Sequence, residues 1–393
     1  MNRLKLNVAL LAACQAFNRM GSSMMVTTGA IVGAQLSGDV SYATIPIALM
    51  FVAQTLAAFP SSMAMKRLGR KVGFIGACLI GTAGASVCAW AIIVNSFWLF
   101  CAGIVGLGIF NGAALFYRFA AAESATPDFR GKAISLVLAG GVVAGVLGPE
   151  LAKWSKDWFL PYAFAGVYVA IAVNAILSVP LLYSTDLPRP TIEEWRERGR
   201  PLLVIARDAR FLVAVLLGVA AYAIMALLMT VTPLAMVACG QSFENAAFVV
   251  QWHVVGMYGP AFFTGHVVHR FGTYNTVLAG ALMFAGAIAF AVTGIDLINF
   301  WGSMFLLGVG WAFMFVGATT LVTEVHTAPE RAKTQALNDM IVFGSVALSS
   351  FTAAPVLKDL GWNTLNYMTL PVLAAAVLAT LWLKTRPARV ATA

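Results

Sequence analysis

The most informative side chain for function is Arg19, which lies within a long apolar segment near the start of the chain. If that segment is a membrane helix beginning near Asn7, Arg19 lies about 18 Å along it, near its middle. A charge at that depth costs at least about 2.5 kcal/mol unless it faces water or a partner. Gln15 lies one turn earlier on the same face, and Asn18 and Ser22 form a neighbouring polar stripe. These residues predict a substrate-binding surface, and the alternative is a structural ion pair between helices.

Other polar residues inside apolar segments are candidates for binding or proton transfer. Arg118 follows Asn111 by two turns on one face of a predicted helix, and it faces either the substrate or nearby Glu123. His253 stands beside Trp252, and an imidazole titrates near neutral pH. His253 is therefore a candidate carrier of a coupling proton, with a hydrogen-bonded contact between helices as the alternative.

An aromatic stripe is predicted in the second half of the chain. Trp311 and Phe315 are four residues apart, so they share one face of a helix, and Tyr222 lies at comparable depth in another segment. Such stripes often face lipid or a neighbouring helix, and the second interpretation is a binding wall. Arginine and aromatic rings together suit a planar or anionic organic molecule, through charge-assisted hydrogen bonds and stacking.

The composition indicates that membrane helices position these residues. The chain has 393 residues, of which 60% are apolar and 10% are charged, whereas soluble domains carry about 25% charged residues. So few charges cannot cover a soluble fold, which excludes a soluble enzyme, a nucleic-acid-binding domain and a disordered chain. We therefore predict an all-α integral membrane protein. Spans long enough to cross a bilayer are expected at 6–34, 42–64, 73–94, 97–122, 133–153, 158–183, 211–237, 244–268, 274–294, 298–323, 335–357 and 364–384.

The positions of lysine and arginine predict the orientation in the membrane. With both termini in the cytoplasm, 20 of the 25 basic residues fall on the cytoplasmic side and three on the outer side. The one long polar stretch divides the spans into two sets of six. We therefore expect an N-terminal bundle over 1–183, a cytoplasmic linker over 184–210 and a C-terminal bundle over 211–393.

The two halves also repeat one another in sequence. Phe97-Trp98 recurs as Phe300-Trp301, 203 residues later, and Gly106-Leu107-Gly108 recurs as Gly308-Val309-Gly310, 202 residues later. Small residues at such positions let helices approach closely. Two six-helix halves repeated in parallel, with a substrate site near the midplane between them, form a transporter architecture.

The loop after the second span resembles the signature of the major facilitator superfamily (MFS), Gly-x-x-x-Asp-Arg/Lys-x-Gly-Arg-Arg/Lys. Residues 62–71 read Ser-Met-Ala-Met-Lys-Arg-Leu-Gly-Arg-Lys, so they match its second half but carry Lys66 at the Asp position. A degenerate copy at 265–272 carries His269 there. With the span count and the duplication, the resemblance covers the whole chain. It implies an MFS fold of two pseudo-symmetric six-helix bundles, in which helices 1, 4, 7 and 10 line the substrate cavity. More loosely, the chain resembles a bacterial branch that includes riboflavin permeases.

The resemblance also implies a gate, in which the Lys66 departure has a physical reading. In the family, the acid at the end of helix 2 faces the start of helix 11, where this chain has Asp339. We therefore hypothesise a charge-swapped brace between Lys66 and Asp339. The alternative is that the helix dipole alone favours an acid at a helix start. The other predicted gate residues are Arg67, Arg70 and Arg270.

The motifs support neither enzyme nor metal chemistry. The five cysteines contain no Cys-x-x-Cys pair, and there is no Walker A motif. The two Gly-x-Gly motifs lie inside predicted spans with no preceding strand, which argues against a dinucleotide site. We expect no cofactor and no bound metal.

The expected function is that of a secondary active or facilitative transporter of a small organic molecule, working by alternating access. The alternative is a non-transporting sensor or assembly factor of the same fold. We expect a monomeric multi-pass protein of a bacterial inner membrane with no nucleic-acid partner. Protons are the candidate coupling ion, and facilitated diffusion is the alternative.

Overall fold

The computed structural model describes residues 3–124, 130–187, 200–326 and 330–385. In these residues the secondary structure is helical, and they contain no β-strand. One group of helices comprises α1 (Arg3–Ser37), α2 (Ile45–Leu68), α3 (Arg70–Ile93), α4 (Phe97–Ala114), α5 (Tyr117–Glu123), α6 (Arg130–Ser155) and α7 (Ala165–Tyr183). The other comprises α9 (Ala209–Ala238), α10 (Phe243–Tyr258), α11 (Ala261–Phe271), α12 (Thr273–Val292), α13 (Leu297–Val325), α14 (Arg331–Tyr367) and α15 (Leu370–Lys384). Two short helices, η1 (Val40–Tyr42) and α8 (Leu202–Ala206), lie in connections.

These helices cross the molecule twelve times within the described residues, if α4 with α5 and α10 with α11 are each counted as one interrupted pass. Eight helical stretches of the described chain are long and apolar enough to cross a membrane. The helix α1 is not among them, and it carries the polar residues Gln15, Asn18 and Arg19. The predicted all-α membrane fold is confirmed.

Local sequence explains where the helices depart from the predicted spans. The predicted span 244–268 is interrupted after Tyr258, where Pro260 precedes α11 and has no N–H to continue the helical bonding. The predicted span 158–183 becomes helical only at Ala165, and Phe164 just before it adopts a left-handed backbone with φ 70°. In α14, the helical backbone is broken at Gly361, which has φ 77°.

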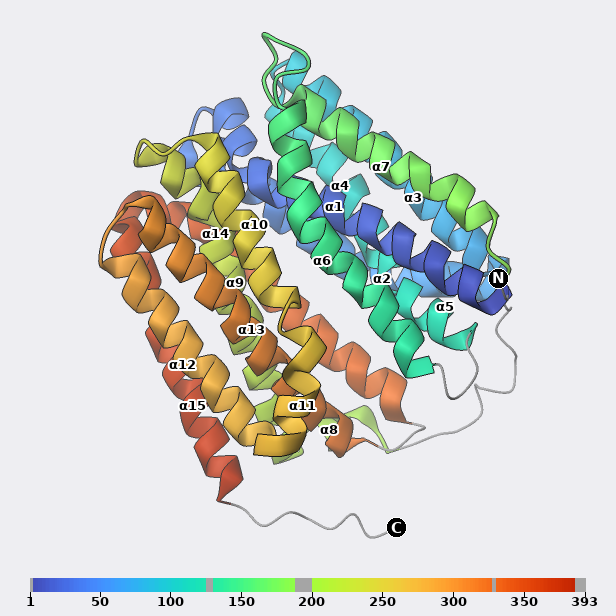
Figure 1. The fold of residues 1–393 in the computed structure, drawn as a ribbon, viewed down its shortest axis with the longest axis vertical. Helices are drawn as coiled ribbons and strands as arrows, with labels where there is room; N and C mark the ends of the chain where they lie inside the picture. The colour runs from blue at the N-terminus through green and yellow to red at the C-terminus, as the bar shows by residue number, and fades with distance from the viewer. Residues whose placement is uncertain (1–2, 125–129, 188–199, 327–329, 386–393) are drawn as a thin grey trace.

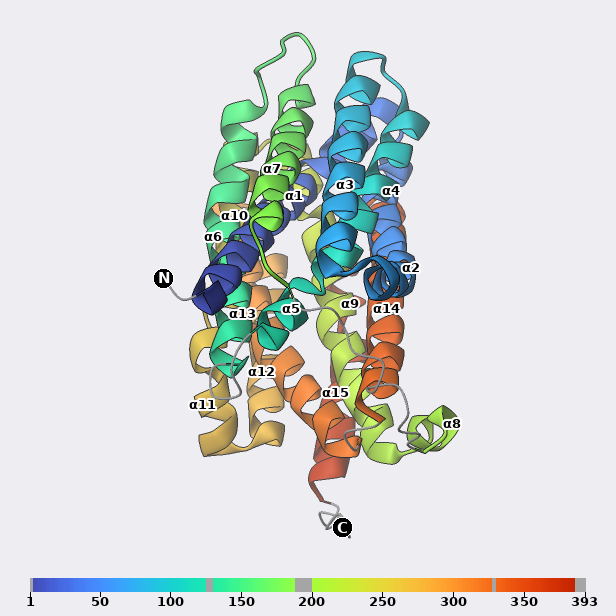
Figure 2. The ribbon, with the colours of Figure 1, turned by 90° about the vertical axis from the view of Figure 1, so that its right-hand side faces the viewer.

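The two groups of helices form two halves of the molecule, with α1–α7 at the upper right and α9–α15 at the lower left of Figure 1. They meet where α6 packs beside α10 and where α2 packs beside α14. Away from these contacts the halves diverge, so that the first turn of α1 lies at the right and the last turn of α15 at the bottom of Figure 1. Figure 2 shows the same arrangement from the side, with α1, α3 and α7 above α9, α13 and α15.

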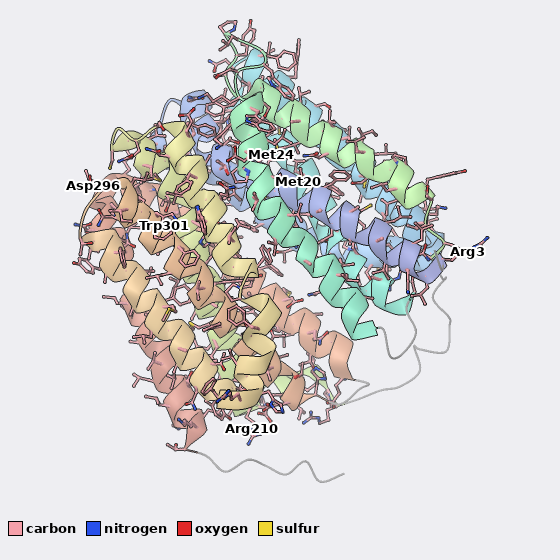
Figure 3. All side chains as sticks on the ribbon, viewed as in Figure 1. Arg3, Met20, Met24, Arg210, Asp296 and Trp301 are labelled. Carbon is pink, nitrogen blue, oxygen red and sulfur yellow. The ribbon has the colours of Figure 1, made fainter. Side chains whose placement is uncertain are left out.

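We call the helix ends near Arg3 and Arg210 the terminal end, and the end that carries the α1–α2 and α12–α13 turns the distal end. Figure 3 shows Arg3 and Arg210 at the far tips of their halves, with Asp296 at the opposite end of the second half. The three lysines predicted to lie away from the termini, Lys153, Lys156 and Lys358, are each paired with an acid.

Between described residues, two ion pairs join the halves, and both lie at the distal end. Lys156, just after α6, lies 2.9 Å from a carboxylate oxygen of Glu244 at the start of α10. Lys358 of α14 lies 2.7 Å from a carboxylate oxygen of Asp39, between α1 and η1. The two lysines are 202 residues apart in sequence and the two acids 205. The pairs are therefore related by the internal repeat, and we call them the distal ion pairs.

Glycine positions show the same repeat in the backbone. Gly69 joins α2 to α3 with φ 90° and ψ 151°, and Gly272 joins α11 to α12 with φ 81° and ψ 157°. Only glycine adopts this backbone readily. Within the helices, a Cβ on Gly108 would lie 2.5 Å from a carbonyl oxygen of α2, and one on Gly308 would lie 2.4 Å from a carbonyl oxygen of α10. The predicted close helix approach at the Gly-x-Gly motifs is confirmed.

The connection between the halves is tied down at both of its described ends. Asp186 and Asn7 exchange two hydrogen bonds, with donor–acceptor distances of 2.6 and 3.0 Å. At the other end, the Arg200 guanidinium donates to both carboxylate oxygens of buried Glu330 and to the carbonyl of Val325. Residues 188–199 of the predicted linker lie outside the described part of the chain.

Candidate functional site

Aromatic side chains of α9 and α13 form a packed group near the middle of the second half. The Tyr222 ring meets Trp311 and Phe315 edge-on, with centroid distances of 5.2 and 4.9 Å. Trp311 and Phe315 stack on each other at 5.1 Å, with their planes 15° apart. The four-residue spacing on α13 makes this stack possible, because residues i and i+4 are neighbours on a helix face.

Two further rings complete this group, and neither was predicted from the sequence. Phe343 of α14 lies 5.4 Å from Tyr222, and Tyr258 of α10 lies 6.2 Å from Trp311. Gly141 of α6 lies against the Tyr258 ring, which a Cβ at that position would approach to 3.2 Å. The central aromatic group, defined as Tyr222, Tyr258, Trp311, Phe315 and Phe343, thus touches both halves of the protein.

Three charged side chains, contributed by both halves, interact electrostatically with Tyr222. Arg19 of α1, Arg118 of α5 and Asp339 of α14 all interact electrostatically with the Tyr222 phenol, and Arg118 also interacts with Arg19 and with Asp339. We call these three residues the central charged group. Among the described residues, none of the three has a direct ion-pair partner. The two halves therefore present opposite charges to each other beside the aromatic rings.

Asp339 lies deeper in its helix than expected. The predicted span begins at 335, but α14 begins at Arg331, which places Asp339 eight residues into the helix, about 12 Å along its axis. Its carboxylate accepts a hydrogen bond of 3.1 Å from the side chain of Asn338. The Lys66 side chain lies outside the described part, so the Lys66–Asp339 brace stays a prediction.

The other predicted gate residues lie at the terminal ends of α2, α3 and α11. Arg67 and Arg270 are exposed, and Arg70 is half-buried. The Arg270 guanidinium lies over the ring of Phe271 at 5.7 Å. Arg67 and Arg270 each lie two residues before the turn glycine of their half, so they occupy equivalent places, and Arg70 directly follows Gly69.

Two of the predicted site residues bind each other inside the first half. Asn18 donates a hydrogen bond of 2.8 Å to the side-chain oxygen of Asn111, which also accepts one of 3.1 Å from Ser22. Asn18 and Asn111 are buried, beside a cavity of about 10 Å³ that is also lined by Ile171 of α7. This geometry fixes α1 on α4. Gln15 is also buried, and its side-chain oxygen has no hydrogen-bond partner among the described residues.

Trp252 and His253 lie apart from the central aromatic group. His253 is fully buried, and its Nδ1 donates a hydrogen bond of 2.7 Å to the carbonyl oxygen of Met304 on α13. Trp252 is partly exposed and contacts Trp301 and Phe305, whose rings stack at 5.7 Å. Figure 3 shows Trp301 on α13 near the distal end. The structure therefore divides the sequence-predicted aromatic residues into two separate groups.

Twelve membrane passes in two repeated halves, with charged and aromatic side chains of both halves meeting at the centre, define a membrane transporter. The comparison with protein families agrees with this class. The chain belongs to the Major Facilitator Superfamily, whose family model matches residues 11–350.

Relatives of known sequence match almost the whole chain. The riboflavin transporter RfnT of Brucella anthropi is 38% identical over 383 residues, which cover 97% of this chain and 96% of that protein. The uncharacterised MFS-type transporter YdeG of Bacillus subtilis is 27% identical, over 86% of this chain and 82% of that protein.

Two solved structures share the fold at 16% sequence identity. A D-xylose–proton symporter superposes with a TM-score of 0.76, covering 96% of this chain and 97% of that chain. A bacterial homologue of the human lysosomal transporter Spinster, in an inward-facing and occupied conformation, superposes with a TM-score of 0.69, covering 97% and 98%. This protein is thus a multi-pass small-molecule transporter and not an enzyme.

Proposed function

We propose that the protein transports riboflavin, or a flavin closely related to it, by alternating access. The observation that carries the proposal is the central aromatic group faced by two arginines, in a chain 38% identical to a riboflavin transporter. A flavin is a planar heterocycle with a polar edge. Its ring system stacks on aromatic side chains, and its carbonyl oxygens accept hydrogen bonds from guanidinium groups.

The substrate-binding residues in this proposal are those that converge on Tyr222. Trp311 and Phe315 supply the stacking surface, and Arg19 and Arg118 supply hydrogen-bond donors. The indole N–H of Trp311 has no acceptor among the described residues, although the side chain is only 6% exposed. A ligand carbonyl beside it satisfies that donor.

The remaining predicted site residues take supporting roles. Gln15 lies one turn from Arg19 and offers an unpaired side-chain oxygen to the ligand. Asn18 and Asn111 hold α1 against α4, which positions Arg19. His253 and Trp252 act in the packing of α10 on α13, so proton coupling through His253 is not part of the proposal.

We further propose that both termini lie in the cytoplasm of a bacterium and that the structure is the inward-facing state. Twenty of the 25 basic residues support this orientation. The distal end is then the outer end, which the distal ion pairs hold closed. In the outward-facing state, Arg67, Arg70 and Arg270 form part of the surfaces that meet at the cytoplasmic end, with Lys66 and Asp339 as the candidate brace.

Riboflavin uptake into proteoliposomes that contain the purified monomer tests the proposal. Uptake above protein-free vesicles is expected, and comparison with and without a proton gradient separates proton coupling from facilitated diffusion. If the protein binds riboflavin but does not transport it, the result supports the alternative of a non-transporting sensor. The similarity to a riboflavin transporter argues against that alternative. Absence of both binding and uptake contradicts the proposal.

A matched pair of tryptophan variants localises the site. Trp311→Ala removes the stacking surface and is expected to weaken riboflavin binding about 5- to 100-fold, the usual effect of losing an aromatic stack. Trp301→Ala is the control, because Trp301 also stacks on a phenylalanine four residues later on α13 but belongs to the other aromatic group. Fluorescence quenching of the flavin measures both. Equal losses in the two variants contradict the proposed site.

A further inference from the structure

We propose that Asp339 and Arg118 together recognise an imide edge on the substrate, which is a ring N–H flanked by two carbonyl groups. The inference rests on the proposed function, since a flavin carries such an edge on its pyrimidine ring. It assigns to Asp339 a role in selecting the substrate, which differs from the gate role hypothesised from the sequence.

The position of Asp339 on its helix places the carboxylate beside the aromatic group. Phe343 lies four residues later, so the two side chains share one face of α14. The Phe343 ring contacts Tyr222 at 5.4 Å, and the Asp339 carboxylate interacts electrostatically with the same tyrosine. A planar ligand stacked on Trp311 and Phe315 therefore presents an edge to Asp339.

The hydrogen-bonding capacity of these groups is not used up within the protein. Asp339 accepts a single described hydrogen bond, from Asn338, although a carboxylate accepts several. Arg118 Nε is buried without a hydrogen-bond partner among the described residues, and the Trp311 indole N–H is in the same condition. Buried polar groups in this state cost free energy unless a ligand or water satisfies them. The two unpaired donors come from different halves of the protein, Arg118 from α5 and Trp311 from α13.

The guanidinium of Arg118 and the carboxylate of Asp339 determine which hydrogen-bonding groups the ligand edge must carry. A guanidinium only donates hydrogen bonds and an ionised carboxylate only accepts them. Arg118 and Asp339 interact electrostatically, and neither has an ion-pair partner among the described residues. In this proposal one ligand edge lies against both. That edge must offer a donor next to acceptors, which is the pattern of an imide. Arginines alone would favour an anion, and the Asp339 charge opposes an anionic edge.

Two flavins that differ only at the imide nitrogen test this assignment. Riboflavin has the N–H, and 3-methylriboflavin has a methyl group in its place. The wild-type protein is expected to bind riboflavin about 10- to 100-fold more tightly, since a buried acceptor left without its donor weakens binding by this order. Binding is measured by flavin fluorescence quenching in detergent.

Variants at Asp339 show whether this residue causes the difference in affinity between the two flavins. Asp339→Leu is expected to bind riboflavin at least about tenfold more weakly and to bind both flavins within about twofold of each other. Asp339→Asn keeps an acceptor oxygen and the shape of the side chain, and it is expected to retain part of the discrimination. Glu324→Leu is the control, because Glu324 is an exposed carboxylate on α13 that interacts with Arg210 instead. It is expected to behave as the wild type.

The outcomes separate this inference from the proposed function. Discrimination that persists in Asp339→Leu shows that the methyl group is rejected by shape alone and overturns the role of Asp339. Equal binding of both flavins by the wild type overturns the role of the imide edge and leaves riboflavin transport standing. A wild-type protein that binds neither flavin overturns the proposed function together with this inference. Unfolding temperatures of both Asp339 variants confirm that each is folded when binding is measured.

Discussion

Reversing the charge of Glu244 is expected to shift the protein from the proposed inward-facing conformation toward the outward-facing one. Glu244 lies 2.9 Å from Lys156 and joins the two halves at the distal end, and its side chain is 56% exposed. An exposed ion pair contributes about 0.2–1 kcal/mol, and Glu244→Lys adds repulsion of similar size. The total of about 0.4–2 kcal/mol corresponds to a change of about 2- to 30-fold in the ratio of the two conformations.

The distance between one label on each half, both at the terminal end, reports the ratio of the inward-facing to the outward-facing conformation. Leu68 and Phe271 are exposed, at 62% and 57%, and each precedes the turn glycine of its half. Cysteines at these two positions carry spin labels, on a background in which Cys239 is replaced by serine, since Cys239 is exposed and the other four cysteines are buried. Electron spin resonance is expected to show more molecules with a short distance between the labels in Glu244→Lys.

Two further variants make the test specific. Asp296→Lys introduces the same charge change at the distal end, but Asp296 lies in the turn between α12 and α13 and joins no ion pair between described residues of the two halves. The exchange of Lys156→Glu with Glu244→Lys restores opposite charges and is expected to restore the wild-type distances. If Glu244→Lys acts no more strongly than Asp296→Lys, or if the exchange does not restore the distances, the distal ion pairs do not stabilise this conformation.

The remaining predictions concern the pH response and the stability of the fold. The lysine partner of Asp39 lowers the pKa of that carboxyl from 3.8 to about 2, so this ion pair is expected to be fully formed above pH 3.8 and lost only as the pH falls through about 2, which the same label distance measures. Gly308→Ala is expected to destabilise the protein by about 1–3 kcal/mol, because its Cβ would lie 2.4 Å from a carbonyl oxygen. Gly344→Ala is the control, because a Cβ there meets nothing within 4 Å. A lower unfolding temperature for Gly344→Ala than for Gly308→Ala contradicts the packing argument. Arg200→Ala is expected to cost about 1–3 kcal/mol, because it leaves the buried Glu330 carboxylate without its guanidinium donors, and Arg200→Lys should recover part of the lost unfolding temperature.

The fold was predicted well from the sequence because each membrane-spanning segment must itself be apolar and long enough to cross the bilayer. A bilayer requires long apolar helices, so composition and span length alone indicate an all-α membrane protein. The Gly-x-Gly motifs also predicted close helix packing correctly, because Gly308 lies where a Cβ would meet a neighbouring carbonyl. The breaks near Pro260 and Phe164 were not predicted, because a hydropathy pattern continues through a local change of backbone conformation.

The sequence was less informative about how the site is assembled. Arg19, Tyr222 and Trp311 stood out because charged and aromatic residues are conspicuous in apolar spans. In the structure Tyr222 contacts Trp311 and interacts electrostatically with Arg19. Phe343 and Tyr258 were missed, since a single aromatic residue in a membrane helix is usually a lipid or packing contact. Nothing in the order of residues says which face of a helix turns toward the other half.

Composition, charge placement and the internal repeat thus determined a membrane transporter of two similar halves, because these properties depend only on what each segment contains. Tertiary structure alone decided that Asn18 binds Asn111 within one half, and that Asp339 of one half interacts electrostatically with Arg118 of the other. It also paired Lys156 with Glu244, which is 88 residues away in the chain. Side-chain partners depend on the relative rotation and tilt of packed helices, and these are set by contacts between segments far apart in sequence.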